Sequence, residues 1–379
     1  MARLLRFLLI ARFKQRQTHQ GFTLIELLVA MIIAVLVMTP LMALAINLIN
    51  TDRREQAKST SEQELQSAAD FIARDLERAI YVYDAVALTR NHNAIDANIS
   101  GIRDQIPPIQ PVSGCNNTAT CIPVLAFWTR RPVHQAVPLN STINCNSPST
   151  NHEQVCDDTF VYSLVVYYLI VNQNNNNVWS NTARIGRFQI SDGVKLGENY
   201  LEDIRNTQAF VSDGNKRDAG FAPFNLGLNE SIRLSMNQWK QGKKNLSTRQ
   251  ISPEPFGRNS MQILVDYIDH TTLTTNIPTP LCSSPVTPDP HTGWIQSPYY
   301  GTYQNPVAIG NATPAQFQTY SFYSCINAQQ GIAKIYLRGN ALARIQGRNN
   351  PPQFSTSPNI QAFFPTISIE VNAEGAINQ

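Results

Sequence analysis

The fold of this chain is decided by the stretch Gly21-Phe22-Thr23-Leu24-Ile25-Glu26-Leu27-Leu28-Val29, which opens an apolar run that continues to Ile49. The run from Phe22 to Ile49 contains one ionisable side chain, that of Glu26, and it exceeds the about 20 residues that a helix needs to cross a bilayer. A carboxylate inside a membrane is costly unless it finds a partner. Glu26 is therefore a candidate functional residue.

Residues 1–21 precede this run and contain five basic residues and no acidic residue. An ordinary secretory signal is cleaved after its apolar part, whereas this basic segment ends directly before the long apolar run. The positive-inside rule keeps the basic segment in the cytoplasm and sends the chain after Ile49 out of the cytoplasm. From these features alone, an uncleaved signal anchor remains an alternative to a cleaved leader.

The distribution of charge along the chain disfavours nucleic acid as a partner. The five basic residues of the leader contribute more positive charge than the formal net charge of +3, so the rest of the chain is slightly acidic. Its remaining basic residues are scattered rather than gathered in a stripe, which disfavours nucleic-acid binding. The 42% hydrophobic content is ample for a sizeable core.

A basic leader followed by Gly21, Phe22 and the sequence Thr-Leu-Ile-Glu-Leu-Leu-Val-Ala resembles the N-terminus of type IV pilins and type II secretion pseudopilins. This resemblance implies that a prepilin peptidase cuts between Gly21 and Phe22 and that Phe22 is then N-methylated. It also implies that Glu26 meets the N-terminal amine of a neighbouring subunit, a pairing that makes both buried charges tolerable. The implied partners are other major and minor pilins or pseudopilins, an inner-membrane assembly platform and the membrane itself.

Beyond the apolar run the helical period continues. Apolar side chains recur three or four positions apart at Leu65, Ala69, Ile72, Leu76, Ile80 and Tyr83. This spacing predicts one helix from Phe22 to about Tyr83, with one face available for packing. Pro40 predicts a kink or a locally melted segment inside it, although membrane helices also tolerate proline.

The remainder of the chain predicts an antiparallel sheet that receives the apolar helix face, which makes an α+β fold. Short apolar or β-branched segments separated by polar stretches predict strands at 122–128, 160–171, 182–191, 262–268, 319–326, 332–337 and 366–371. Residues 172–177 predict a hairpin loop, and 195–206 a short helix. The resulting organisation is a leader at 1–21, a transmembrane helix at 22–49, an amphipathic helix at 50–84 and an extracytoplasmic domain at 85–379.

Six cysteines lie in the extracytoplasmic part, which includes two long loop-rich stretches, 91–117 and 276–314. An even number of cysteines outside the cytoplasm predicts disulfides, and six allow about 15 connectivities. Nearest-neighbour pairing gives Cys115–Cys121, Cys145–Cys156 and Cys282–Cys325. A zinc site is disfavoured because no pair has the short spacing of a zinc knuckle.

The search for catalytic chemistry finds no nucleophile elbow, metalloprotease helix or phosphate-binding glycine loop. His270 with Asp266 and Asp269 is more simply a solvated strand end, and the segment 213–218 lacks most ligands of a calcium loop. Three aromatic residues lie near Trp294 in the sequence, namely Tyr299, Tyr300 and Tyr303. They suggest either packing or a sugar-stacking surface. We expect no catalytic residue, no metal site and no cofactor, and hence no enzyme.

The resemblance can be narrowed by two further segments. Residues 67–76, Ser-Ala-Ala-Asp-Phe-Ile-Ala-Arg-Asp-Leu, are similar to the PilW and J-type branch of minor pilins and pseudopilins. Residues 333–343 and 363–366 are similar to hormogonium polysaccharide secretion pseudopilins of the HpsC type. This resemblance implies a minor pseudopilin in a periplasmic or cell-surface filament that supports polysaccharide secretion and gliding motility. The alternatives are a minor pilin that primes or tips a retractable type IV pilus in adhesion, and a membrane-anchored extracytoplasmic enzyme.

Overall fold

The computed structural model describes residues 21–140, 143–147, 152–171, 178–204, 213–229, 231–245, 248, 250–257, 259–272, 282, 293–299, 314–327, 329–346 and 350–373. Residues 1–20 of the predicted leader, the predicted hairpin loop at 172–177 and most of the stretch 276–314 lie outside the described residues. The chain divides into two compact units, Met1–Arg53 and Arg54–Gln379, and helix α2 (Leu24–Glu77) contributes residues to both.

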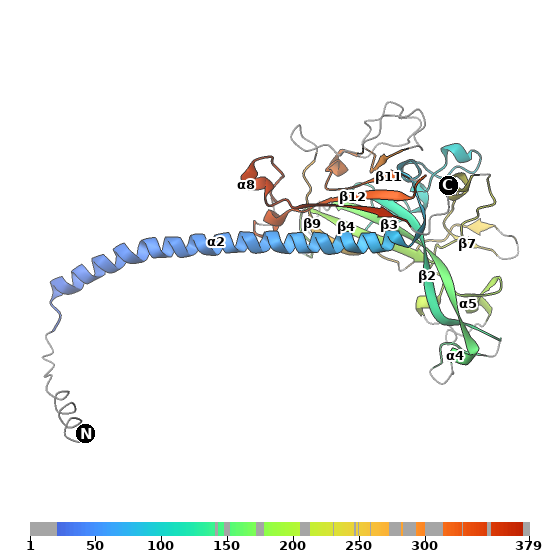
Figure 1. Ribbon diagram of the computed structural model, residues 1–379, viewed down its shortest axis with the longest axis horizontal. Helices are drawn as coiled ribbons and strands as arrows, with labels where there is room; N and C mark the ends of the chain where they lie inside the picture. The colour runs from blue at the N-terminus through green and yellow to red at the C-terminus, as the bar shows by residue number, and fades with distance from the viewer. Residues whose placement is uncertain are drawn as a thin grey trace, which may run out of the picture. The chain divides into compact units, whose positions relative to one another are not determined.

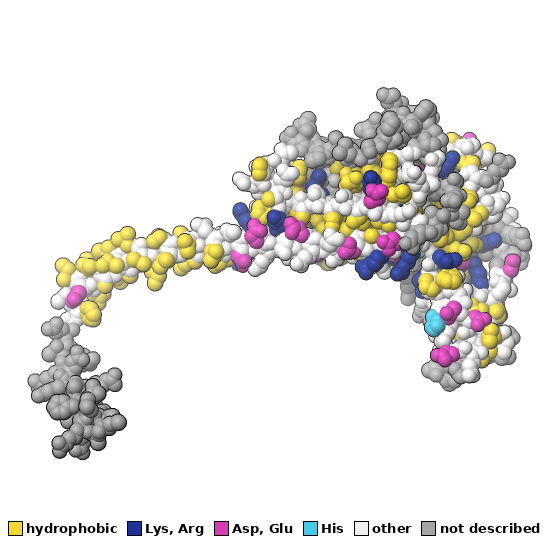
Figure 2. Space-filling view, viewed as in Figure 1, with side chains coloured by type: hydrophobic (Ala, Val, Ile, Leu, Met, Phe, Trp, Pro, Cys, Tyr) yellow, Lys and Arg dark blue, Asp and Glu magenta, His cyan; other side chains and the backbone are white. Residues whose placement is uncertain are grey.

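The first part of α2 is apolar on every side. Every side chain from Phe22 to Ile49 is exposed except that of Ala45. Figure 2 shows hydrophobic atoms along this part of the helix. Among the described residues, α2 alone is long and apolar enough to cross a membrane, with a mean hydropathy of 2.7 in its most apolar window. A helix that is apolar all round is stable in lipid or among other helices rather than in water.

The second part of α2 belongs to the large unit and buries the predicted stripe. Leu65, Ala69, Ile72 and Leu76 are almost completely buried in the main core. The helix ends at Glu77, so its predicted extension to Tyr83 is wrong. Residues Ala79–Val82 instead form strand β1, which pairs antiparallel with Phe127–Thr129 of β2. Aromatic and β-branched side chains in this segment favour a strand once a partner strand is present.

Two antiparallel sheets make up most of the domain (Figure 1). The first sheet has the order β1-β2-β3-β4-β9, with bounds β2 (Cys121–Pro138), β3 (Cys156–Val171), β4 (Ala183–Ser191) and β9 (Gln262–Ile268). The second has the order β10-β11-β12-β13, with bounds β10 (Ile295–Ser297), β11 (Phe322–Asn327), β12 (Ile332–Arg338) and β13 (Thr366–Asn372). The predicted α+β fold, in which a long N-terminal helix packs on antiparallel sheets, is confirmed.

Shorter elements fill the connections. They are α3 (Ala85–Thr89), η2 (Ala97–Ile99), η3 (Arg103–Gln105), α4 (His152–Val155), β5 (Lys195–Leu196), β6 (Asn199–Tyr200), α5 (Leu201–Ile204), η5 (Asp213–Asn215), α6 (Ile232–Asn237), β7 (Lys243–Lys244), β8 (Ile251–Ser252), η6 (Ala315–Phe317), η7 (Ala341–Arg344) and α8 (Pro358–Gln361). The helix predicted at 195–206 is wrong for its first half, because Lys195–Leu196 and Asn199–Tyr200 pair as a small hairpin. Gly197 supplies the positive φ of that tight turn.

The first sheet separates two cores. On one face, Phe127, Val165 and Ile185 pack with the stripe of α2 and with the inner side chains of the second sheet. On the other face, Trp128 and Phe188 pack under loops that follow β1 and β4. Alternation along each strand produces this division, because successive side chains point to opposite faces. The second half of α2 is therefore a core element of the domain.

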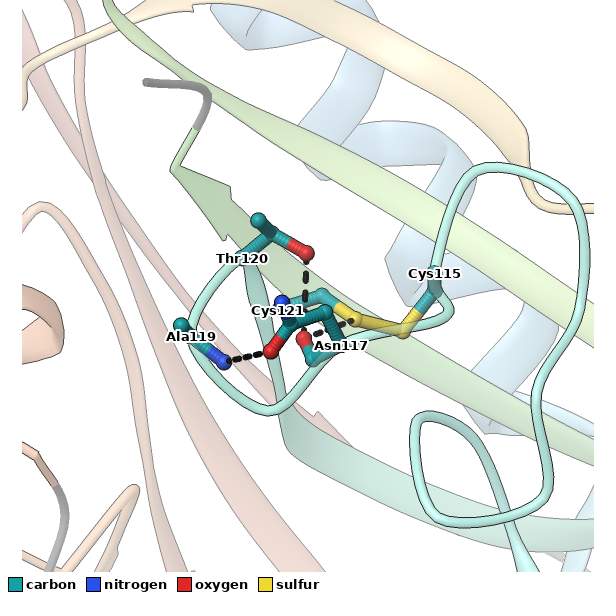
Figure 3. Close-up of a disulfide and its surroundings, with 5 residues drawn as sticks. All are labelled: Cys115, Asn117, Ala119, Thr120 and Cys121. Carbon is teal, nitrogen blue, oxygen red and sulfur yellow. Dashed lines mark hydrogen bonds between the residues drawn. A yellow bond between two sulfur atoms is a disulfide. The ribbon is translucent and has the colours of Figure 1, made fainter. Parts of the chain in front are cut away.

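All six cysteines are paired. The disulfides are Cys115–Cys121, Cys145–Cys156 and Cys282–Cys325, with Cα–Cα distances of 5.8, 6.0 and 5.5 Å, and they are the pairs that nearest-neighbour pairing gives. Within the first loop, the Ala119 amide donates to Asn117 Oδ1 at 2.8 Å and the Thr120 hydroxyl donates to the Asn117 carbonyl at 3.0 Å (Figure 3). The tight turn thus formed leads directly into β2.

Candidate processing and assembly site

The start of α2 is organised by two side chains. The Thr23 hydroxyl donates to Glu26 Oε2 at 3.3 Å, and the Glu26 amide lies 3.4 Å from Thr23 Oγ1 and 3.1 Å from the Thr23 carbonyl. A Thr followed three residues later by Glu is the pattern of a helix capping box. Glu26 therefore has a local structural role in addition to the assembly role that the resemblance implies. The sequence contained this signal, but its role as a cap was not predicted.

Gly21 lies before the helix, and the fold makes no demand on it. A Cβ atom added at this position meets nothing within 4 Å, and the φ of Gly21 is not in the left-handed region. A glycine that neither packing nor backbone conformation requires is available for recognition by another molecule. Phe22 next to it is 80% exposed, so the bond between Gly21 and Phe22 is accessible.

Helix α2 runs through Pro40 without interruption. The locally melted segment that the sequence left open at this position is therefore absent. Pro40 has no amide hydrogen to donate to the carbonyl of Leu36. One residue earlier, the Thr39 hydroxyl donates to the Val35 carbonyl at 2.8 Å, the kind of side-chain bond by which Thr adapts membrane helices to proline.

The polar residues around His270 act in the fold. Asp269 forms a buried ion pair with Arg338 at 2.9 Å and accepts a hydrogen bond from the Thr271 hydroxyl at 2.6 Å. Asp266 accepts hydrogen bonds from Ser180 at 2.5 and 2.8 Å. Burial lowers the pKa of His270, and the negative charge of Asp269 offsets this lowering only in part. Both carboxylates are thus engaged by neighbouring elements.

The remaining candidates are also placed by the fold. Asp218 accepts a hydrogen bond from the Ser191 amide at 2.7 Å, so it joins the segment after η5 to the end of β4. Tyr299 is fully buried against α3, and Lys334 lies 4.7 Å from the centre of the Trp294 ring. Tyr300 and Tyr303 lie outside the described residues. Within the described part of the chain, no group of three or more His, Cys, Asp or Glu side chains has metal-binding geometry.

Comparison with known families adds an independent observation at this point. The chain carries a prokaryotic N-terminal methylation motif. Residues 16–42 match the family model of that description, so the match begins in the leader and includes Gly21, Phe22, Glu26 and Pro40. This motif is the type IV pilin signal, so the match supports a likeness of the chain to type IV pilins and pseudopilins. The motif also implies processing by a prepilin peptidase and assembly with other pilins. No curated protein and no solved structure matches the chain.

The methylation motif and the geometry of α2 agree with each other. The motif covers the capped start of the helix and the apolar segment that is exposed on all sides. Together they fit a single-pass protein anchored in a membrane by its N-terminal helix. The described residues after α2 form the two-sheet domain.

Proposed function

We propose that this chain is a minor pseudopilin, a structural subunit that is cut between Gly21 and Phe22, methylated on Phe22 and stored in the inner membrane by α2. It then leaves the membrane to join a short filament, in which Glu26 pairs with the N-terminal amine of a neighbouring subunit. Its large unit stands outside the cytoplasm. The chain has no catalytic role of its own in this proposal.

The observation that supports this proposal best is the match of the methylation motif to residues 16–42. The matched segment contains Gly21, which the fold does not require to be glycine, and the first part of α2, whose apolar side chains are exposed. Such a helix needs other apolar partners, and lipid and neighbouring helices both supply them. In a filament the buried carboxylate of Glu26 also needs a positive partner, because an unpaired buried charge is strongly destabilising.

We further propose that the filament is of the hormogonium type and supports polysaccharide secretion and gliding. The support for this finer assignment is the similarity of residues 333–343 and 363–366 to that group of pseudopilins. In the structure the first segment contains β12 except for Ile332 and η7 except for Arg344, and the second leads into β13. The competing role is that of a minor pilin in a retractable pilus.

Mass spectrometry of the mature N-terminus tests the processing step. The expected mature chain begins with methylated Phe22, and Gly21→Val leaves a full-length precursor. Gly214→Ala is the control, because a Cβ atom added at Gly214 also meets nothing within 4 Å and Gly214 lies far from the cleavage site in the sequence. A Gly21→Val protein that is shortened like the wild type contradicts the cleavage assignment.

Assembly dependence separates the two kinds of filament. Export of the wild-type domain to the cell surface is measured in strains that lack either the assembly ATPase of the pilus or that of the polysaccharide secretion system. Loss of export only in the second strain supports the pseudopilin assignment. Loss only in the first strain supports the minor pilin instead.

A further inference from the structure

The outer face of the second sheet carries a cavity of about 540 Å³ with aromatic walls. Its aromatic lining residues are Tyr320, Tyr323, Tyr336, Phe354 and Phe364. Alternation along β11 and β12 sends Phe322 and Ile335 into the main core and leaves Tyr323 and Tyr336 on the opposite face. The volume lies within the range of about 300–1,000 Å³ that is typical of small-molecule sites.

The aromatic rings of the lining pack against one another in pairs, one pair stacked and two pairs edge to face. Tyr323 and Tyr336 are direct cross-strand partners, and their rings stack with centroids 4.6 Å apart and planes 5° apart. Tyr320 meets the edge of Tyr323 at 5.9 Å, and Phe354 meets Phe364 at 5.5 Å and 89°. These geometries are the preferred ones for aromatic pairs, so the walls are stable without a ligand.

Hydrogen bonds hold the wall that comes from the loop before α8. The Phe354 amide donates to the Thr271 hydroxyl at 2.7 Å, and Asn340 Nδ2 donates to the Pro352 carbonyl at 2.7 Å. The guanidinium of Arg338 lies 4.6 Å from the centre of the Phe354 ring. A site whose walls are fixed in advance loses little conformational entropy when a ligand binds.

The cavity has no free charge on its described lining. Arg338 is the one Lys, Arg, Asp or Glu residue among the described lining residues. It is 6% exposed, and it donates to Asp269 at 2.9 Å and to the Thr319 carbonyl at 2.8 Å. Burial raises the pKa of Tyr323, so this phenol stays neutral. A phosphorylated or strongly acidic ligand finds no unpaired cation here.

Uncharged polar groups complete the lining. The side chains of Gln361, Thr366 and Ser368 are exposed at the cavity, and none of them has a hydrogen-bond partner among the described residues. The hydroxyls of Tyr323 and Tyr336 on the lining likewise have no hydrogen-bond partner among the described residues. These uncharged groups supply both donors and acceptors to a ligand, whereas the charges of Arg338 and Asp269 are already paired with each other.

Flat aromatic faces beside uncharged hydrogen-bonding groups match the chemistry of a sugar, which offers an apolar C–H face and a rim of hydroxyls. We propose that this cavity binds neutral saccharide units of a glycan. A proline-rich peptide also docks on aromatic walls. Its prolines offer carbonyl acceptors but no N–H or O–H donors, so they cannot use the acceptor atoms of Gln361, Thr366 and Ser368. The saccharide is therefore the better match, and its binding does not depend on assembly of the chain into a filament.

Binding is tested with the full chain in a zwitterionic detergent that has no sugar headgroup. The probes for calorimetry are cellohexaose, maltohexaose and mannohexaose, with hexagalacturonate as the acidic probe and decaproline as the peptide probe. We expect at least one neutral hexasaccharide to bind, and Tyr336→Ala to weaken it about tenfold or more. Tyr162→Ala is the control, because Tyr162 is an aromatic residue of β3 that is 38% exposed outside the cavity, and it should leave binding unchanged.

A second variant guards against misfolding of Tyr336→Ala. Gln361→Ala combined with Ser368→Ala changes exposed side chains only, and it should weaken binding several-fold with an unchanged melting temperature. The proposal is overturned if no neutral hexasaccharide binds, if the decaproline or the acidic probe binds more tightly, or if both cavity variants bind as well as the wild type.

Discussion

Asp75 in the last turn of α2 lies 2.7 Å from Arg187 of β4, measured from Oδ2 to Nε. The same carboxylate oxygen accepts a hydrogen bond from the Tyr167 hydroxyl at 2.7 Å. The Asp75 and Arg187 side chains are only 20% and 12% exposed. This pair fixes the end of the helix against two strands of the first sheet.

Asp75→Asn should destabilise the domain by about 2–3 kcal/mol, because it leaves the mostly buried guanidinium of Arg187 without its counter-charge. All four tryptophans lie beyond Arg54, so their fluorescence during denaturation reports on the large unit. The control is Glu370→Gln, which breaks the more exposed pair with Lys334 and should cost less than about 0.5 kcal/mol. Equal losses in the two variants contradict a special role for Asp75.

Glu26 can be tested for its two roles separately. Glu26→Gln keeps a capping-box side chain but removes the charge, whereas Thr23→Ala removes the cap and keeps the charge. If charge pairing with a neighbouring amine is needed, Glu26→Gln reduces incorporation into filaments and Thr23→Ala does so much less. Immunoblots of sheared filaments measure incorporation, and the mature mass shows whether processing continues. The reverse order of the two variants indicates that capping is the role of Glu26.

The stability of the domain should fall as the pH drops below about 6.5. Burial lowers the pKa of His270 in the folded chain, and the charge of Asp269 opposes this only partly. The unfolded chain therefore takes up the proton first, and folding loses free energy between the ordinary pKa of histidine and the lowered one. His270→Gln removes this contribution and flattens the dependence, measured as denaturation midpoints at about pH 7.5 and about pH 5.5. His92 shifts in the same direction, with burial as the main cause, so some slope should remain.

The disulfides should contribute unequally. Cys282–Cys325 closes a separation of 43 residues and Cys115–Cys121 one of 6. In the chain-entropy model, their replacement by paired serines costs about 4 and about 2 kcal/mol. Denaturation of the two double variants, followed by tryptophan fluorescence, measures the difference. A larger loss from the short loop indicates that native packing around Cys115, rather than chain entropy, dominates.

The strands were predictable from the sequence where apolar and polar side chains alternate within the strand itself. In β13, Ile367, Ile369 and Val371 point inward while the residues between them are exposed, and the burial repeats the sequence pattern. Strand β1 was missed because Ile80 and Tyr83 also continue the helical spacing. Its structure depends on pairing with β2, more than forty residues later in the chain, and a local pattern carries no information about such a partner.

The two candidate sites differ in the same way. Gly21, Phe22 and Glu26 lie within six consecutive residues, so the sequence alone was enough to predict them as candidates. The aromatic cavity combines β11, β12, the loop at Phe354 and the residues around Phe364, and nothing in the sequence joins them. The sequence did suggest a sugar-stacking surface near Trp294 and Tyr299. Of these two, Tyr299 is buried against α3, whereas Trp294 packs in the aromatic cluster that contains Tyr323.

The burial of Leu65, Ile72 and Leu76 sets a limit on how the domain can be produced. A fragment that starts at β1 would lack one wall of its own core and would expose the side chains of Val165 and Ile185 to water. The compact unit begins at Arg54. A water-soluble version for crystallography or ligand screening should therefore start at about Arg54, so that it keeps the buried second half of α2 and omits the exposed apolar first half.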